Sequence, residues 1–147
     1  NVAMEIEYQI FEKENLLIQK FTGRFSFELY MRYARGIVKN PAMRSINKVL
    51  IDFRDLDFRD VPVDFGEGLD RMTNLRRKIQ QNEIKRDDVT VVFWVDKPIP
   101  TVIAQVLQVN FSHYFYCSTK KCVLKVIKVS EDFKDLELVI DDLKNTY

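Results

Sequence analysis

The chain opens with a pattern in which apolar and polar positions alternate. From Met4 to Phe11 every second residue is apolar, which is the period of a strand with one buried face. A polar turn at residues 13–15 follows, and residues 16–22 form a second apolar stretch. The pattern therefore predicts an N-terminal β-hairpin.

Further along, apolar runs that favour strands alternate with stretches in which apolar residues recur every three or four positions, as on one helix face. The predicted strands lie at residues 48–54, 89–95 and 123–129. The predicted helices lie at about residues 27–38, 65–79, 102–114 and 131–143. Ser26 and Ser130 stand where the first and last helices need an N-cap.

This order of elements predicts one α/β domain. Repeated strand–helix–strand units imply parallel pairing through right-handed crossovers, and the hairpin makes the sheet mixed. We expect a single domain with a mixed, mostly parallel sheet of about five strands and about four helices. Residues 1–3 precede the first methionine, and we expect them to be a vector-derived remnant ahead of a domain at residues 4–147.

Composition and charge limit the classes of partner. The chain has 147 residues, of which 46% are hydrophobic and 31% charged, as in ordinary globular domains. A net charge of +1 gives no field that would attract nucleic acid. No apolar run approaches the roughly 20 residues of a membrane span, and no secretory signal pattern is present. We expect neither a nucleic-acid partner nor a transmembrane segment.

The chain contains two cysteines, Cys117 and Cys122, and one histidine, His113. Two thiols in a domain of this size favour a reducing compartment over a disulfide scaffold, so we expect a cytoplasmic protein. Structural zinc takes four ligands, which these residues cannot supply, and no third group orients His113 with Cys117 as a nucleophile. We expect no metal and no cofactor, with Cys122 as a small buried residue that opens the last strand.

A buried strand at residues 48–52 ends in alternating charges. Carboxylates at the carboxyl end of a central strand stand where α/β proteins often place ligands. The arginines Arg54 and Arg59 are interleaved with them, however, which favours charges that pair within the loop. We therefore expect no catalytic residue here, and we expect Asp52 to support the structure.

The stretch Val49–Asp60, with Gly68 and Leu69 further on, resembles the central strand, acidic turn and helix start of STAS domains. The order of elements is similar to that of their SpoIIAA-like branch, the anti-sigma-factor antagonists. The resemblance implies a non-enzymatic regulatory module that binds a protein partner, or a second copy of itself, through the turn and the neighbouring strand end. The partner-binding residues that it implies are Asp57, Arg59, Asp60, Asp64, Glu67, Gly68, Asp96 and Lys97.

One position departs from that family. Its switching members carry a phosphorylated serine immediately before the Gly-Leu pair, where this chain has Glu67. No serine lies between Ser45 and Ser112, and a glutamate at the start of a helix is favoured by the helix dipole. We expect no serine phosphoswitch.

An aromatic run near the end of the third predicted helix supports a second hypothesis. Phe111, Tyr114, Phe115 and Tyr116 cannot all face inward on one helical stripe. They indicate an apolar ligand pocket or a homodimer surface, and hence a carrier of a lipid or another apolar small molecule.

A basic cluster ends the second predicted helix, at Arg76, Arg77, Lys78, Lys85 and Arg86. The helix dipole favours cations at that end. Aromatic residues are not interleaved with them, as a platform for stacking bases would require. The dipole accounts for the cluster, and we expect Arg76, Arg77 and Lys78 to lie largely off the apolar stripe of the helix. Nucleic-acid binding and weak attachment to an anionic membrane surface are the minor alternatives.

Overall fold

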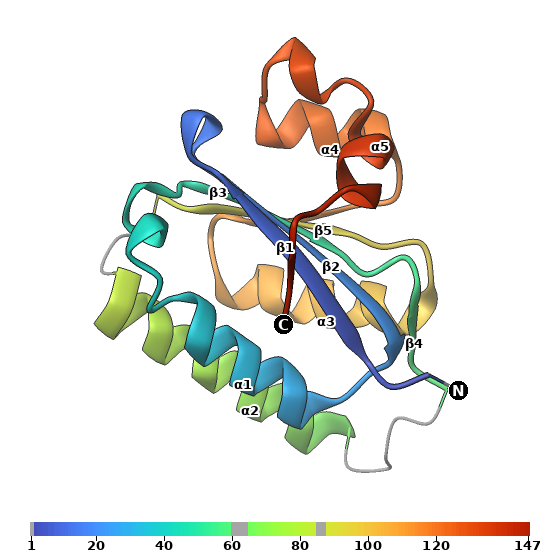
Figure 1. The fold of residues 1–147 in the computed structure, drawn as a ribbon. Helices are drawn as coiled ribbons and strands as arrows, with labels where there is room; N and C mark the ends of the chain where they lie inside the picture. Colours follow the sequence, from blue (N-terminus) through green and yellow to red (C-terminus); the bar gives the residue numbers. More distant parts are fainter. Residues whose placement is uncertain (1, 60–64, 85–87) are drawn as a thin grey trace.

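The structure is a computed structural model that describes residues 2–59, 65–84 and 88–147 (Figure 1). The strands are β1 (Glu5–Phe11), β2 (Leu16–Arg24), β3 (Lys48–Asp52), β4 (Leu56–Asp57), β5 (Thr90–Trp94), β6 (Tyr114–Cys117) and β7 (Asn145–Thr146). The α-helices are α1 (Phe27–Ile37), α2 (Phe65–Ile79), α3 (Pro98–Asn110), α4 (Lys120–Ile127) and α5 (Leu136–Asp141). Short 3₁₀ turns lie at Glu12–Glu14, Pro41–Ser45 and Glu131–Phe133, and a π-helical turn at Gln80–Ile84 continues α2.

The described strands form one mixed sheet in the order β6-β5-β3-β2-β1-β7, and β4 pairs with the end of β2. Strands β2, β3, β5 and β6 run parallel to one another, whereas β1 is antiparallel to β2 and to β7. The predicted hairpin and the mixed, mostly parallel sheet are therefore confirmed. The two-residue strands β4 and β7 are additions that no periodicity could predict.

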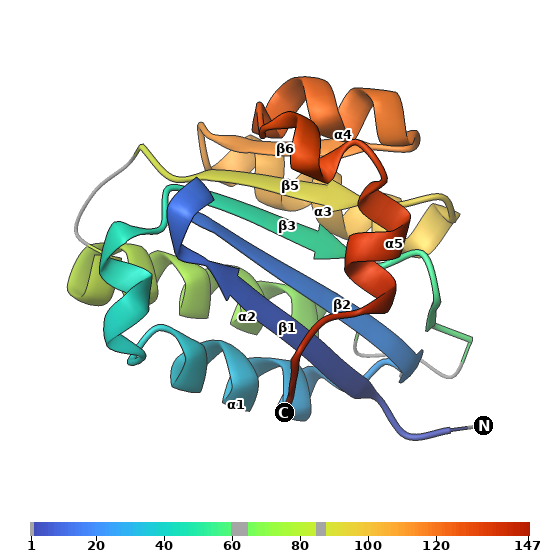
Figure 2. The same ribbon diagram turned by 45° about the horizontal axis from the view of Figure 1, so that its top comes forward.

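Helices cover both faces of the sheet (Figure 2). Helices α1, α2 and α3 pack on one face, and α4 and α5 pack on the other. The side chains of β3 show why both faces are buried: Val49 and Ile51 contact the first layer, and Leu50 contacts the second. A central strand of a parallel sheet is apolar on both faces for this reason.

The third predicted helix extends too far, and the last predicted strand is wrong. Helix α3 ends at Asn110, because Phe111 takes an extended backbone conformation, and residues 114–117 form β6. Residues 123–127, predicted as strand, belong to α4. The Thr119 side chain caps this helix by accepting a hydrogen bond from Cys122 N at 3.2 Å. Val123 and Ile127, four residues apart, are its buried positions.

Of the two predicted N-caps, Ser26 is confirmed and Ser130 is not. Ser26 caps α1, since its hydroxyl accepts a hydrogen bond from Leu29 N at 3.2 Å. Ser130 makes no such bond and precedes a 3₁₀ turn, so the last helix begins later than predicted, at Leu136.

The two cysteines form a disulfide, contrary to the prediction of free thiols. Cys117 ends β6 and Cys122 lies in the first turn of α4, with their Cα atoms 5.6 Å apart. The argument from reduced thiols to a reducing compartment therefore fails, and a cytoplasmic location stays a prediction. No helix in the described part of the chain is both long and apolar enough to cross a bilayer.

Two glycines of α2 make a matched pair for testing how closely α2 approaches α1. A Cβ atom at Gly68 would lie 2.5 Å from the Phe27 ring of α1, whereas one at Gly66 would meet nothing within 4 Å. We expect Gly68→Ala to lower the free energy of unfolding by about 1–2 kcal/mol, because overpacking outweighs the gain in helix propensity. Gly66→Ala should raise it by about 0.5–1 kcal/mol. Urea unfolding of both variants measures this, and equal stabilisation by both would show that Phe27 moves aside freely.

Candidate functional site

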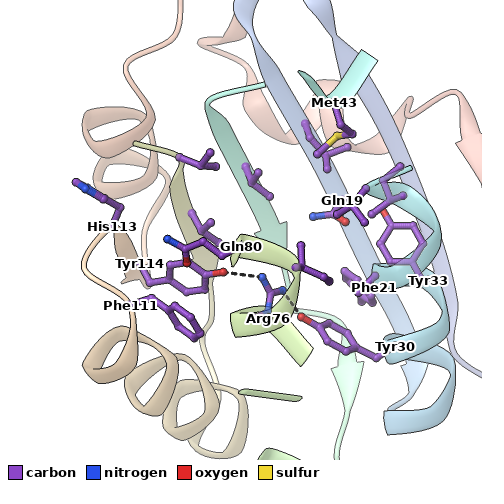
Figure 3. Close-up of a pocket in the computed structure, with 18 of the residues that line it drawn as sticks. Gln19, Phe21, Tyr30, Tyr33, Met43, Arg76, Gln80, Phe111, His113 and Tyr114 are labelled. Carbon is purple, nitrogen blue, oxygen red and sulfur yellow. Dashed lines mark hydrogen bonds between the residues drawn. The ribbon is translucent and has the colours of Figure 1, made fainter. Parts of the chain in front are cut away.

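A cavity of about 90 Å³ lies between the sheet, α1, α2 and the start of β6 (Figure 3). Most of its lining is apolar. Leu17, Val49 and Val91 line it from three neighbouring strands, and Ala34 and Ile37 line it from α1. Among the residues that line it, Ser112 and His113 are exposed, so this end of the cavity adjoins solvent.

Arg76 reaches into this cavity from α2 (Figure 3). Its Nη1 donates a hydrogen bond to Tyr114 Oη at 3.0 Å, and its Nη2 donates one to Tyr30 Oη. The guanidinium carbon lies 5.5 Å from the ring centres of Tyr30 and Tyr114 and 5.7 Å from that of Phe93. Aromatic rings and phenol oxygens thus surround the cation.

No carboxylate neutralises Arg76 within the described ranges. Its hydrogen-bond partners are phenols, and its Nε is buried without a partner. Burial raises the pKa of Tyr30, an effect that the Arg76 charge only partly offsets, so this phenol is neutral at pH 7. Among the described residues, dipoles and ring faces surround the positive charge, and the side chain is partly buried.

Two further polar groups line the cavity. The Tyr33 hydroxyl is buried without a hydrogen-bond partner, and burial raises its pKa. Gln19 extends from β2 toward the cavity, is 6% exposed, and its side chain makes no hydrogen bond to any described residue (Figure 3). Together with Arg76 Nε, these groups give the cavity unused hydrogen-bond donors.

The four residues of the predicted apolar ligand or dimer surface do not lie together in the structure. Phe111 and Tyr114 line the cavity. Phe115 packs on the opposite face of the sheet, and Tyr116 is exposed beside α3, where its Oη accepts a hydrogen bond from Gln105 Nε2 at 3.2 Å. The reason is that residues 114–117 are a strand, whose side chains alternate between faces.

The prediction that Arg76 lies off the apolar stripe of α2 is wrong. Arg76 follows the buried Met72 and Thr73 by four and three positions, which places it on the inward face of α2. That spacing was visible in the sequence. Its basic neighbours Arg77 and Lys78 are exposed, as predicted.

Asp52 has the supporting position that the sequence predicts. Its carboxylate is 1% exposed and accepts hydrogen bonds from Arg54 N, Nε and Nη2 at 3.0, 3.0 and 2.9 Å. The Arg54 guanidinium stacks on Trp94, 3.5 Å from the ring centre. Burial opposes the charge of Arg54, yet the hydrogen bonds and charge of Asp52 raise its pKa overall.

Part of the predicted partner-binding surface is assembled around an open cleft of about 630 Å³. Asp57, Arg59 and Lys97 line this cleft, together with residues 98–100. Hydrogen bonds from the Arg59 side chain and backbone N–H lower the pKa of Asp57 to about 2. Lys97 donates hydrogen bonds to Asp96 at 3.0 Å and to the Arg54 carbonyl, so Asp96 is next to a residue of the cleft but does not line it.

The other predicted partner-binding residues are not part of this cleft. Asp60 and Asp64 lie outside the described residues. Glu67 is exposed in the first turn of α2, while Gly68 is buried where α2 packs on α1.

Comparison with known proteins finds a similarity of fold. No family model matches the chain, and no curated protein does. The chain is similar to a solved structure of an uncharacterised protein of the DUF3478 family from Shewanella loihica PV-4, described as having a SpoIIAA-like fold. The TM-score is 0.52 at 14% sequence identity, covering 86% of this chain and 97% of the other. The predicted fold is thereby confirmed: this chain has a SpoIIAA-like fold.

Proposed function

We propose that this domain is a non-enzymatic module that binds a small apolar molecule in the cavity beneath α1 and α2. The main support for this proposal is an apolar cavity into which a few polar groups converge, which is the usual form of a ligand site. Enclosed sites for larger ligands measure roughly 300–1,000 Å³. A cavity of about 90 Å³ therefore favours a short ligand over a whole lipid.

The chemistry of the cavity interior supports binding without turnover. The polar groups of its interior are a guanidinium, phenols and amides, whereas Ser112 and His113 lie at its exposed end. General acid–base catalysis works best with groups whose pKa lies near the working pH, whereas burial raises the pKa of Tyr30 and Tyr33 further above it. These groups are suited to holding a ligand in one orientation.

An NMR titration tests this proposal. ¹⁵N-labelled protein is titrated with straight-chain alcohols and acids of four to eight carbons. We expect chemical-shift changes to concentrate at residues that line the cavity. Ala34→Met, which fills the cavity from α1, should reduce binding at least tenfold. Val109→Met, at an 88% exposed helix position, is the control and should bind like the wild type. Scattered shift changes, or unchanged binding by Ala34→Met, would refute the proposal.

Protein binding at the Asp57 cleft is the second candidate, because the fold brings Asp57, Arg59 and Lys97 together there. A partner captured by the wild type would be purified and its binding measured directly. The double variant Asp57→Ala with Arg59→Ala should bind it at least tenfold more weakly while unfolding at the same urea concentration. Equal affinity would remove the cleft from the binding surface. Lys144→Ala, at a distant exposed ion pair, is the matched charge control.

A further inference from the structure

We infer that the ligand of this cavity is a short apolar monocarboxylate whose carboxylate binds Arg76. The inference rests on the proposed function, because it names the chemical class of molecule for the same cavity. It starts from a mismatch in the described structure: an arginine in an apolar cavity with no acidic partner.

The surrounding groups leave part of the guanidinium unused. Two hydrogen bonds to Tyr114 and Tyr30 occupy one N–H each of Nη1 and Nη2, and Nε is buried without a partner. An arginine has more N–H donors than these bonds use. The unpartnered Tyr33 hydroxyl lines the same cavity. An acceptor bound at Nε would satisfy a donor that is otherwise buried without a partner.

The aromatic rings alone do not account for this arrangement. The ring centres lie 5.5–5.7 Å from the guanidinium carbon, near the outer limit at which a ring face attracts a cation, so this attraction is weak. Partial burial disfavours the charge, and a bound counter-charge offsets that cost best. The rings therefore hold the guanidinium in position, and an anion completes the site.

The charge and size of the cavity select a monocarboxylate. Arg76 is the single lysine, arginine or carboxylate side chain of the described lining, and His113 lies at the exposed end. A phosphate dianion would keep one charge unmatched in apolar surroundings. A carboxylate matches the guanidinium in charge and in its two-oxygen geometry. A benzene-binding cavity measures about 150 Å³, so about 90 Å³ encloses only a few carbons of an aliphatic chain, and the rest of a longer chain would extend toward the exposed end at Ser112 and His113.

The test compares hexanoate with hexan-1-ol, which have the same number of carbons and differ in charge. Both are titrated into the whole chain by NMR at pH 7. We expect hexanoate to bind at least tenfold more tightly than hexan-1-ol. Arg76→Met keeps a flexible, helix-favouring side chain without the charge, and it should abolish that preference. Arg77→Met is the matched control, because Arg77 is the next residue of α2, is exposed and bonds to Asn74; it should keep the preference.

A second measurement uses the wild type alone, so it holds even if Arg76→Met fails to fold. The carboxyl carbon of ¹³C-labelled hexanoate is followed against pH while bound. A guanidinium beside it should lower the pKa of the bound acid below that of free hexanoate. An unchanged or raised pKa would overturn the inference.

The outcomes separate the inference from the proposed function. Binding of hexanoate and hexan-1-ol with equal affinity would keep the cavity as a ligand site and refute the carboxylate. Absence of binding by either at the cavity, together with no response to the other chain lengths, would refute both. A tenfold preference for hexanoate that Arg76→Met removes and Arg77→Met retains would support both.

Discussion

Phe53→Ala should lower the free energy of unfolding by about 3–5 kcal/mol, which is the usual loss for a phenylalanine deleted from a core. Phe53 is 0% exposed and directly follows β3. Its ring contacts Phe21 at 5.3 Å and Phe93 at 5.6 Å between ring centres, so it joins the side chains of β2 and β5. Alanine would leave a cavity between strands that cannot move together without breaking the sheet.

Urea unfolding followed by circular dichroism measures this loss. Phe53→Leu keeps most of the volume and should lose about 1–2 kcal/mol. Val109→Ala, at an 88% exposed position, should change stability by less than about 0.5 kcal/mol. A loss below about 1 kcal/mol for Phe53→Ala would mean that the core around this ring can collapse into the space. Since domains of this kind are stable by about 5–15 kcal/mol, the full loss would leave the variant marginal.

Asp52→Ala should lower the free energy of unfolding by about 2–3 kcal/mol. Removing one partner of a buried ion pair costs about 3–5 kcal/mol, and the smaller value here reflects an Arg54 side chain that is 23% exposed. The change removes every hydrogen bond that the Asp52 carboxylate accepts from Arg54. The cation would then lie against Trp94 without its counter-charge.

Two variants calibrate that result. Asp52→Asn keeps an oxygen that can accept from Arg54 N and loses the charge, so it should fall between Asp52→Ala and the wild type. Lys144→Ala removes an exposed pair with Asp142, whose side chains are 61% and 77% exposed, and should cost less than about 0.5 kcal/mol. If Asp52→Ala were as mild as Lys144→Ala, the pair would not support the structure.

The cleft could be predicted from the sequence to a greater extent than the cavity. The cleft residues Asp57 and Arg59 belong to one loop and pair with each other, so their role as a charged rim was predictable from their spacing. The cavity needs β2, α1, α2 and β6 side by side, and residues 19, 33, 76 and 114 are far apart in the chain. Their convergence is a property of the tertiary structure.

The sequence by itself determined the hairpin, β3, β5 and the first two helices. β1 and the helices carry a clear period of two or of three to four residues, whereas β3 and β5 are continuous apolar runs. Ser26 supplies a local helix-start signal that the structure uses. The order of these elements is sufficient to predict the SpoIIAA-like fold. Local pattern is reliable here because each helix buries one face along its length, and β3 and β5 bury both faces.

Only the tertiary structure decided the segment from Phe111 to Ile127 and the role of Arg76. Apolar residues 123–127 suit a strand or a short helix equally well, and the choice depends on β6 filling the place beside β5. With β6 there, Cys117 comes within bonding distance of Cys122, and Tyr114 comes within reach of Arg76. An arginine on a helix is expected in solvent unless distant residues surround it, and Tyr30, Phe93 and Tyr114 do so only after the sheet has formed.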